Sequence, residues 1–238
     1  MWERALRRSD LQVAYSQGFT PHPLLSFGLA LPTGCESLGE YLDVRLGQVR
    51  DDEPGEDELP GLLTSLLPDG IEVQAAVPVE VAEGSLQQEV ASCDWELEVL
   101  EVSGAALVER VERLLAAPSL TVGRERKGRR VNDDIRPAIL ELSVIDPSGR
   151  LRAEVATHPR GVRPVDLVAA LGTGAVPGRA CRTHQWIERD GVRFEPLPLR
   201  RLGIPVAEKE NARRDFPHVG PGSQTDAGGS RPREDGEH

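Results

Sequence analysis

The sequence is poor in cysteine and in aromatic residues, and it has no long apolar run. Its three cysteines, Cys35, Cys93 and Cys181, are odd in number and far apart, which argues against a disulfide framework and against a zinc or iron–sulfur motif. Because the sequence has neither a membrane-length apolar run nor a signal-peptide pattern, we expect a cytoplasmic protein that contacts no membrane. We also expect no metal and no cofactor in this chain.

The sequence also has no excess of positive charge, because its formal net charge is −11. This balance argues against a protein that binds nucleic acid over its whole surface, because phosphates require positive charge nearby. One short run, residues 123–130, nevertheless concentrates basic side chains. Its candidate phosphate contacts are Arg124, Arg126, Lys127, Arg129 and Arg130. A solvated loop is the alternative interpretation of this run.

Arg136 follows the basic run and is a further candidate ligand for RNA. Asp133 and Asp134 lie within reach of it along the chain. The three residues form either a self-neutralising ion-pair cluster or a support that holds the basic hairpin open.

Hydrophobic periodicity predicts the same order of elements twice. The second half is predicted to contain strands at 94–101, 138–146, 150–158, 180–188 and 192–197, helices at 104–117 and 163–172, and a basic hairpin at 120–135. The first half is predicted to contain strands at 41–46 and 71–79 and a helix at 58–68. This strand–helix–strand–strand–helix–strand order predicts an α+β protein with tandem ferredoxin-like (βαββαβ) domains.

The first of these domains lacks its expected first strand. Residues 1–8 have helical composition from Met1 onward, with no strand before them. We therefore expect a chain that begins late, either through a start codon placed downstream or through truncation. The predicted domains span 1–84 and 85–204, and a disordered tail spans 205–238, where Gly, Pro and charge replace periodicity.

The run at residues 15–37 is the strongest candidate for a site, because it combines glycines, prolines, hydroxyls, aromatics and a histidine. Its candidate ligand-binding residues are Tyr15, Ser16, Gln17, Gly18, Phe19, His22, Ser26, Gly28, Gly34, Glu36 and Ser37. The alternative is a long irregular connection between helix and strand.

Several of these residues have a structural and a functional interpretation. For Phe19, packing into the core is favoured over stacking on a base. For Tyr15, neither of these two roles is favoured. His22, between two prolines, is a weak candidate general base, or else it bonds a backbone carbonyl. Gly28 and Gly34 suggest a loop that brings backbone N–H groups close to a phosphate or ribose, without a nucleotide-binding fingerprint. For Glu36 and Ser37, capping the chain is the favoured role.

Residues 4–44 resemble the signature of the radical SAM-linked proteins. These are bacterial proteins of unassigned function that occur beside, or fused to, a radical SAM enzyme with a cobalamin-binding-type domain. The resemblance continues more loosely through the basic hairpin and "DDIRPAILELSV" to about Leu199. It implies that such an enzyme is the partner of this chain, and it names no reaction.

The tandem arrangement also resembles repeat-associated RNA-binding proteins, in which two ferredoxin-like domains hold RNA between them. We therefore expect a substrate-recognition partner that binds an RNA, such as a tRNA or ribosomal RNA, for the radical SAM enzyme. One alternative is a metal-independent RNA-processing enzyme that uses His22. Another is a docking module that binds only the partner protein.

Overall fold

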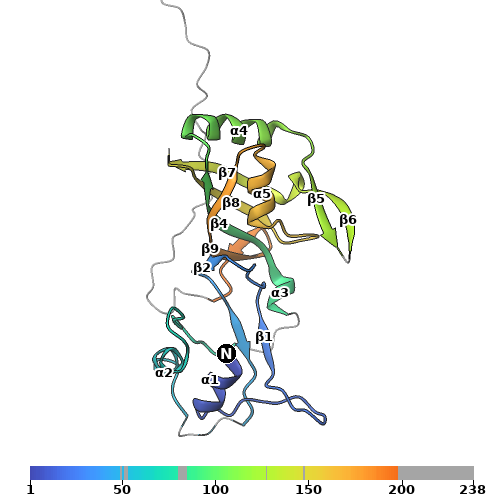
Figure 1. The fold of residues 1–238 in the computed structure, drawn as a ribbon. Coiled ribbons are helices and arrows are strands. Elements are labelled where there is room, and N and C mark those ends of the chain that lie inside the picture. The colour runs from blue at the N-terminus through green and yellow to red at the C-terminus, as the bar shows by residue number, and fades with distance from the viewer. Residues whose placement is uncertain (49, 51–52, 80–84, 127, 147, 198–238) are drawn as a thin grey trace, which may run out of the picture. The chain divides into compact units, whose positions relative to one another are not determined.

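The structure is a computed structural model, and it describes residues 1–48, 50, 53–79, 85–126, 128–146 and 148–197 (Figure 1). All of these residues belong to one compact unit. The predicted tail at 205–238 lies outside the described residues. Within the described part of the chain, no helix is long and apolar enough to cross a membrane.

The main sheet lies in the second half of the chain. Its strands are β4 (Val90–Leu100), β7 (Ile139–Asp146), β8 (Arg150–Ala156), β9 (Val176–Arg189) and β10 (Val192–Phe194). Their spatial order is β10-β9-β4-β8-β7, and each strand runs antiparallel to its neighbours. Two helices, α4 (Gly104–Ala116) and α5 (Pro164–Ala170), connect these strands. The predicted elements of this half are therefore confirmed, each boundary to within four residues.

Alternation of apolar and polar residues explains how this sheet forms its core. In β8, Leu151, Ala153 and Val155 are buried, whereas Arg150 and Arg152 are exposed. The buried side chains of β4 and of both helices join the same hydrophobic cluster, so α4 and α5 cover the same face of the sheet. The opposite face carries the polar side chains of the strands.

The basic hairpin is confirmed as a separate two-stranded ribbon, formed by β5 (Thr121–Arg126) and β6 (Arg129–Asp134). Its base is fixed where the backbone N–H of Leu120 donates to the Asp134 carboxylate (2.8 Å) and the N–H of Ile135 donates to the Leu120 carbonyl (2.9 Å). Ile135 itself is buried in the main core. A 3₁₀ turn, η1 (Arg136–Ala138), then leads into β7.

The first half differs from its prediction. It contains α1 (Trp2–Arg8), β1 (Leu25–Phe27), β2 (Glu36–Ser37), β3 (Leu42–Val44), α2 (Leu59–Leu66) and the short α3 (Leu86–Glu89). The strand predicted at 71–79 is wrong, because this segment is extended but pairs with no strand among the described residues. The fold is therefore a mixed α+β fold, and a tandem ferredoxin-like arrangement is not confirmed. The predicted domain boundary adjoins residues 80–84, which are outside the described residues, and stays a prediction.

The two halves differ in how much apolar surface they bury. Among described residues 1–79, the buried apolar residues are Ala5, Leu6, Pro23 and Leu63, whereas the main cluster is built from residues 86–187. Because burial of apolar surface is the main driving force of folding, the second half carries most of the stability of the chain.

Candidate functional site

Residues 15–23 form an exposed loop that is closed by its own hydrogen bonds. Tyr15 and Pro23 make an antiparallel bridge. The N–H of Ser16 donates to the His22 carbonyl (2.8 Å), and the N–H of His22 donates to the Ser16 hydroxyl (3.0 Å). Gly18 has a φ of +139°, which residues with a side chain rarely adopt. The structure thus brings together the predicted residues Tyr15, Ser16, Gln17, Gly18, Phe19 and His22.

Phe19 lies at the exposed end of this loop, and its side chain is fully exposed. The interpretation that favoured packing of Phe19 into the core is therefore wrong. Gly18, with its positive φ, shapes a loop that leaves this ring in solvent. Tyr15, with an exposed fraction of 42%, is only partly covered. Both rings are accessible to a partner molecule.

His22 is exposed, and its backbone rather than its imidazole closes the loop. Among the described residues, no carboxylate, hydroxyl or thiol makes a hydrogen bond or ion pair with its ring. A general base is usually oriented by a neighbouring acceptor, as in catalytic triads. The arrangement around His22 in this chain therefore supplies no such orienting group.

Gly28 and Gly34 do not form the phosphate-binding loop that the sequence suggested. The N–H of Gly28 donates to the Tyr41 carbonyl (3.0 Å), where β1 meets the residue before β3. A Cβ at Gly28 would lie 3.4 Å from the Gln185 side chain, so this glycine permits close packing against β9. Gly34 has a φ of +85° and occupies a turn, closed by a bond from the Cys35 N–H to the Pro32 carbonyl.

Ser26, Glu36 and Ser37 are held in strands and local turns. Ser26 pairs with Asp43 across the two-stranded sheet of β1 and β3. β2 pairs in parallel with β9, and the Glu36 carboxylate accepts hydrogen bonds from two nitrogens of Arg179 (2.5 and 2.8 Å). The Ser37 hydroxyl accepts from the Gly39 N–H (3.2 Å), a local capping role.

A buried arginine on β9 holds the segment after β1 against the main sheet. The side chain of Arg182 is 2% exposed, and it donates to the Glu40 carboxylate (2.5 and 3.0 Å) and to the Leu29 carbonyl (2.7 Å). Its guanidinium also lies 5.5 Å from the ring centre of Trp95. The Gln185 amide donates to the Gly39 carbonyl (2.5 Å) in the same interface.

Cys93 lies beside Arg182 on the core face of the sheet. Burial raises the pKa of its thiol to about 11, although the Arg182 guanidinium acts in the opposite direction. Burial likewise raises the thiol pKa of Cys35 and Cys181. At neutral pH these thiols are protonated, which disfavours a cysteine nucleophile in this interface.

The ribbon of β5 and β6 carries the predicted basic residues. Its register pairs Arg126 with Arg129, Glu125 with Arg130 and Arg124 with Val131. Directly opposite positions share a face of an antiparallel pair, and so do alternate positions along one strand. Positions 124, 126 and 129 therefore belong to one face of the ribbon. Lys127 lies outside the described residues.

Arg136 has a structural role. Its guanidinium donates to the Leu115 carbonyl near the end of α4 (3.0 Å) and to the Ile139 carbonyl at the start of β7 (3.1 Å). Asp134 accepts instead from the backbone N–H of Arg136 (3.0 Å), and Asp133 forms an ion pair with Arg160. Two backbone hydrogen bonds hold the pKa of the Asp134 carboxyl below its usual range. Asp134 thus anchors the base of the ribbon, whereas a role of this cluster in holding the basic hairpin open stays a prediction.

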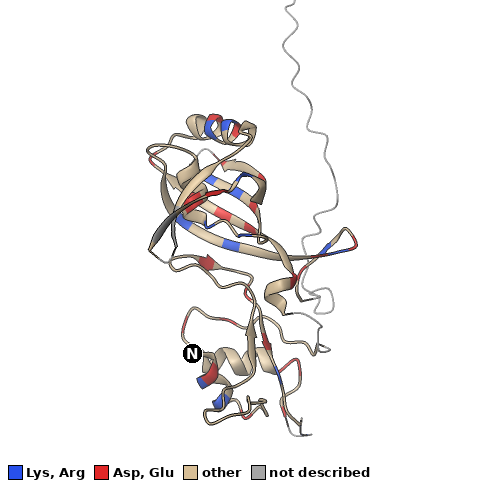
Figure 2. Ribbon diagram, turned by 90° about the vertical axis from the view of Figure 1, so that its right-hand side faces the viewer, with Lys and Arg blue, Asp and Glu red and all other residues tan. Residues whose placement is uncertain are grey.

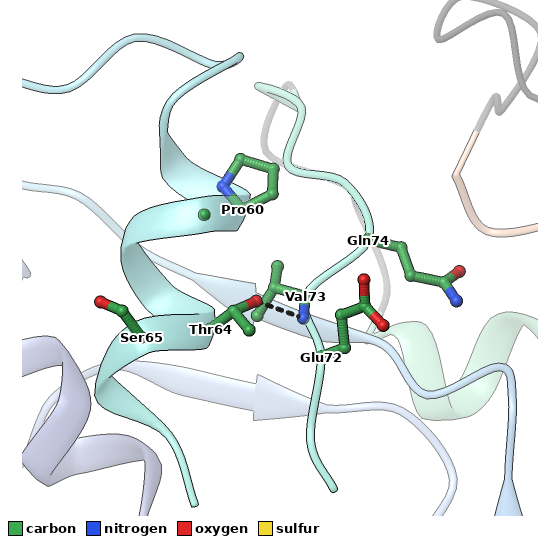
Figure 3. A pocket seen from close by; sticks show the side chains of 7 residues that line it. Pro60, Thr64, Ser65, Glu72, Val73 and Gln74 are labelled. Carbon is green, nitrogen blue, oxygen red and sulfur yellow. Dashed lines mark hydrogen bonds between the residues drawn. The ribbon is translucent and has the colours of Figure 1, made fainter. Parts of the chain in front are cut away.

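An open depression of about 690 Å³ lies between α2 and the extended segment that follows it (Figure 3). It is lined by Pro60, Gly61, Thr64, Ser65, Glu72, Val73 and Gln74. The Thr64 hydroxyl accepts from the N–H of Val73 (2.9 Å) and joins its two walls. Glu72 is the sole ionisable residue of this lining, which gives the depression little means of acid–base chemistry.

The DUF2344 family, described as uncharacterized proteins conserved in bacteria, matches residues 1–164. The chain belongs to this family. The match covers the loop at 15–23, the ribbon and the strands up to β8, but it ends before β9. No curated protein matches the chain. Membership in DUF2344 therefore identifies a bacterial family and assigns no reaction to it.

Sequence reasoning missed a second polar cluster on β9, beyond the end of the DUF2344 match. His184 stacks on Trp186, with 5.2 Å between the ring centres. Its Nδ1 lies 3.9 Å from the Asp94 carboxylate, and its Nε2 lies 3.6 Å from the Glu195 carboxylate. Burial raises the pKa of Glu195, and His184 partly opposes this effect. Carboxylates therefore flank the imidazole of His184 on both sides.

Ion pairs extend this polar face along the sheet. Arg193 pairs with Glu154 (2.7 Å) and lies over the ring of Trp186, and Arg152 pairs with Glu96 (3.4 Å). Figure 2 shows basic and acidic positions interleaved on the strands. The sheet face therefore has little net positive charge to offer to a nucleic-acid backbone.

Proposed function

We propose that this protein is a recognition partner that binds RNA, such as a tRNA or ribosomal RNA, for a radical SAM enzyme in the bacterial cytoplasm. In this proposal the enzyme performs the chemistry, and the present chain positions the substrate. The radical SAM partner rests on the resemblance of residues 4–44 to the radical SAM-linked proteins. The proposal of RNA as the ligand is based on the ribbon formed by β5 and β6.

The ribbon is the single observation that carries the RNA proposal. It stands apart from the main sheet as its own antiparallel pair, and its eight-residue run 123–130 contains five basic residues. Arginine is suited to phosphate, and the ribbon gathers its basic positions on one antiparallel pair. On the main sheet, in contrast, basic side chains form ion pairs with neighbouring acidic side chains. Binding is therefore expected to be local, at the ribbon, in a protein whose net charge is negative.

The loop at residues 15–23 supports the proposal in a second way. Its exposed Phe19 and half-exposed Tyr15 are available to stack on unpaired bases, which is a common mode of single-strand binding. The loop is closed by hydrogen bonds between Ser16 and His22, so the aromatic rings are presented on a pre-formed backbone.

The experiment that tests this proposal is ultraviolet crosslinking of the full chain to cellular RNA, followed by sequencing of the bound RNA. The Arg129→Glu, Arg130→Glu variant should lose the crosslink, whereas the Arg4→Glu, Arg8→Glu variant on exposed α1 should keep it at equal net charge. One enriched RNA class that depends on the ribbon supports the proposal. Background signal from the unmodified chain, or equal loss in both variants, contradicts it.

A second candidate function is a purely protein-binding module, and the full exposure of Phe19 favours it. An exposed aromatic ring on a closed loop is a common anchor for a protein partner. In that case the radical SAM enzyme should co-purify with the chain, and Phe19→Ser should abolish the complex while Arg129→Glu, Arg130→Glu leaves it intact. The third possibility, an RNA-processing enzyme based on His22, gains no comparable observation.

We also infer that residues 1–79 and 90–189 are two copies of the ferredoxin-like element order, the first of them incomplete. In the second copy, the strands follow the order β9-β4-β8-β7 with both helices on one face. In the first copy, α1, β1, β3, α2 and the extended segment 71–79 occur in the order of α4, β7, β8, α5 and β9.

A further inference from the structure

Two buried polar atoms near His184 make no hydrogen bond within the described part of the chain. They are Nε1 of Trp186 and Oε2 of Glu195. Trp186 is 7% exposed and the side chain of Glu195 is 9% exposed, so bulk water hardly reaches either residue. Buried polar atoms in folded proteins nearly always have a partner. The His184 cluster, defined as Asp94, His184, Trp186 and Glu195, is therefore a candidate site for a ligand that supplies one.

The His184 cluster lies where segments from three parts of the sequence meet. Gly39 packs against β9, since a Cβ at this glycine would lie 3.6 Å from Cα of His184. Glu195 follows β10, which pairs with the last residues of β9. The pKa of the Tyr41 hydroxyl is raised by burial and then by the charge of Glu195, which places this carboxylate near Tyr41. Glu195 is thus surrounded by β9, by the segment 39–41 and by its own strand.

His184 does not satisfy the Glu195 carboxylate. Its Nε2 lies 3.6 Å from Oε1 of Glu195, which is too long for a hydrogen bond, and its Nδ1 is 3.0 Å from the Thr183 hydroxyl. Burial raises the pKa of Glu195, because an ionised carboxylate away from water costs free energy unless a cation or an N–H donor reaches it. The site is therefore suited to a cationic ligand that carries N–H groups.

The same face of the sheet shows how a neighbouring carboxylate is satisfied. Arg193 donates from both terminal nitrogens to the Glu154 carboxylate (2.7 and 3.1 Å), and its guanidinium lies 4.7 Å from the ring centre of Trp186. Glu154 also accepts from the Ser92 hydroxyl (2.8 Å). A guanidinium suits such a place because its planar fork binds a carboxylate and its face stacks on an aromatic ring.

Glu195 has similar surroundings without this partner. It is a buried carboxylate beside the stacked rings of His184 and Trp186, and no arginine or lysine of the described residues forms an ion pair with it. His184 gives access to the place, because 36% of its side chain is exposed. A ligand can therefore reach the cluster from solvent along the imidazole.

We propose that the His184 cluster binds a guanidinium group, carried either by a small molecule or by an arginine side chain of a partner protein. The guanidinium donates to Oε2 of Glu195 and lies against the imidazole of His184, as Arg193 lies against Trp186. The indole N–H of Trp186 is then available to an oxygen atom of the same ligand. This inference does not depend on the RNA proposal, because it involves neither the ribbon nor the loop at 15–23.

The first measurement is an NMR titration of the full chain with methylguanidinium at constant ionic strength. Methylurea, which has the same shape and no charge, is the matched control ligand. Methylguanidinium should shift the indole N–H resonance of Trp186 and the ring resonances of His184 in a saturable manner, and methylurea should not. An equal response to both ligands, or no saturable response to methylguanidinium, would overturn the proposal, because water would then be the partner of the buried atoms.

The second measurement compares two variants with the same change in charge. Glu195→Gln keeps the shape of the side chain and removes its charge, so it should weaken methylguanidinium about tenfold or more. Glu188→Gln changes an exposed residue of the same strand and should bind like the unmodified chain. Equal affinities of the two variants would contradict the assignment to Glu195.

Two further ligands distinguish the sources of the guanidinium. Free arginine represents a small molecule, and a tripeptide with arginine between two glycines represents a protein side chain. Tighter binding of free arginine supports the small molecule, whereas tighter binding of the tripeptide supports a partner protein. Citrulline, free and in the same tripeptide, is the uncharged counterpart. Citrulline ligands that bind as well as the arginine ligands would refute recognition of a guanidinium.

Discussion

The ribbon makes a quantitative prediction about salt. If its five basic residues each neutralise one phosphate of a single strand, the logarithm of the binding constant falls with the logarithm of the salt concentration with a slope of about −3.5. The Arg129→Gln, Arg130→Gln variant removes two of these contacts and should give a slope of about −2.1. Glutamine keeps the strand register and adds no negative charge. The change in slope therefore measures how many phosphate contacts the variant has lost.

The difference is measurable by fluorescence anisotropy with a labelled RNA. Between about 50 and 200 mM salt, affinity should fall about 130-fold for the unmodified chain and about 20-fold for the variant. The Arg4→Gln, Arg8→Gln variant has the same net charge and should keep the steep slope. Equal slopes in the ribbon variant and the unmodified chain would refute phosphate binding by the ribbon, even if RNA still bound elsewhere.

Three further predictions concern single residues. Arg136→Met should lower the free energy of unfolding by about 1–3 kcal/mol, measured by urea denaturation, because two charge-assisted bonds to carbonyls are lost; an altered salt slope for RNA would argue against this structural role. Phe19→Ser should leave that free energy within about 0.5 kcal/mol, since the ring is fully exposed; a larger loss would mean that the ring packs. Glu195→Gln should raise the thermal midpoint at pH 7, because a raised carboxyl pKa makes ionisation costly in the folded state. The gain should disappear below the ordinary pKa of 4.5, where Glu195 is protonated in both states, and a gain that persists there would refute burial as its cause.

The second half of the fold could be predicted from the sequence because its pattern and its pairing agree. β4 and β8 place apolar residues at alternate positions on the core face, and each strand of the main sheet pairs with a neighbour that the chain itself supplies. In the segment 71–79, burial alternates from Ile71 to Ala75, yet the segment forms no strand, because a ladder requires a partner and periodicity describes only one strand at a time. Phe19 was misjudged for a similar reason. Composition suggests that an aromatic ring packs into the core, but this ring is fully exposed.

The sequence does not predict on which face of the sheet the polar side chains of β9 lie, because a β-bulge in this strand changes the face that each of them occupies. Register pairs Trp95 with Arg182 and Asp94 with His184, which leaves Thr183 as an extra residue in β9. Arg182 and His184 are two positions apart and would share a face in a regular strand. The bulge instead sends Arg182 into the core and His184 to the polar face. No local sequence signal marks this shift, since it arises from pairing with β4.

The bulge also positions a side chain that links the two halves of the chain. It turns Arg182 inward, where its guanidinium holds Glu40 and the Leu29 carbonyl, both of which lie between β1 and β3. The well-packed second half therefore supplies the anchor for a first half that buries little apolar surface of its own.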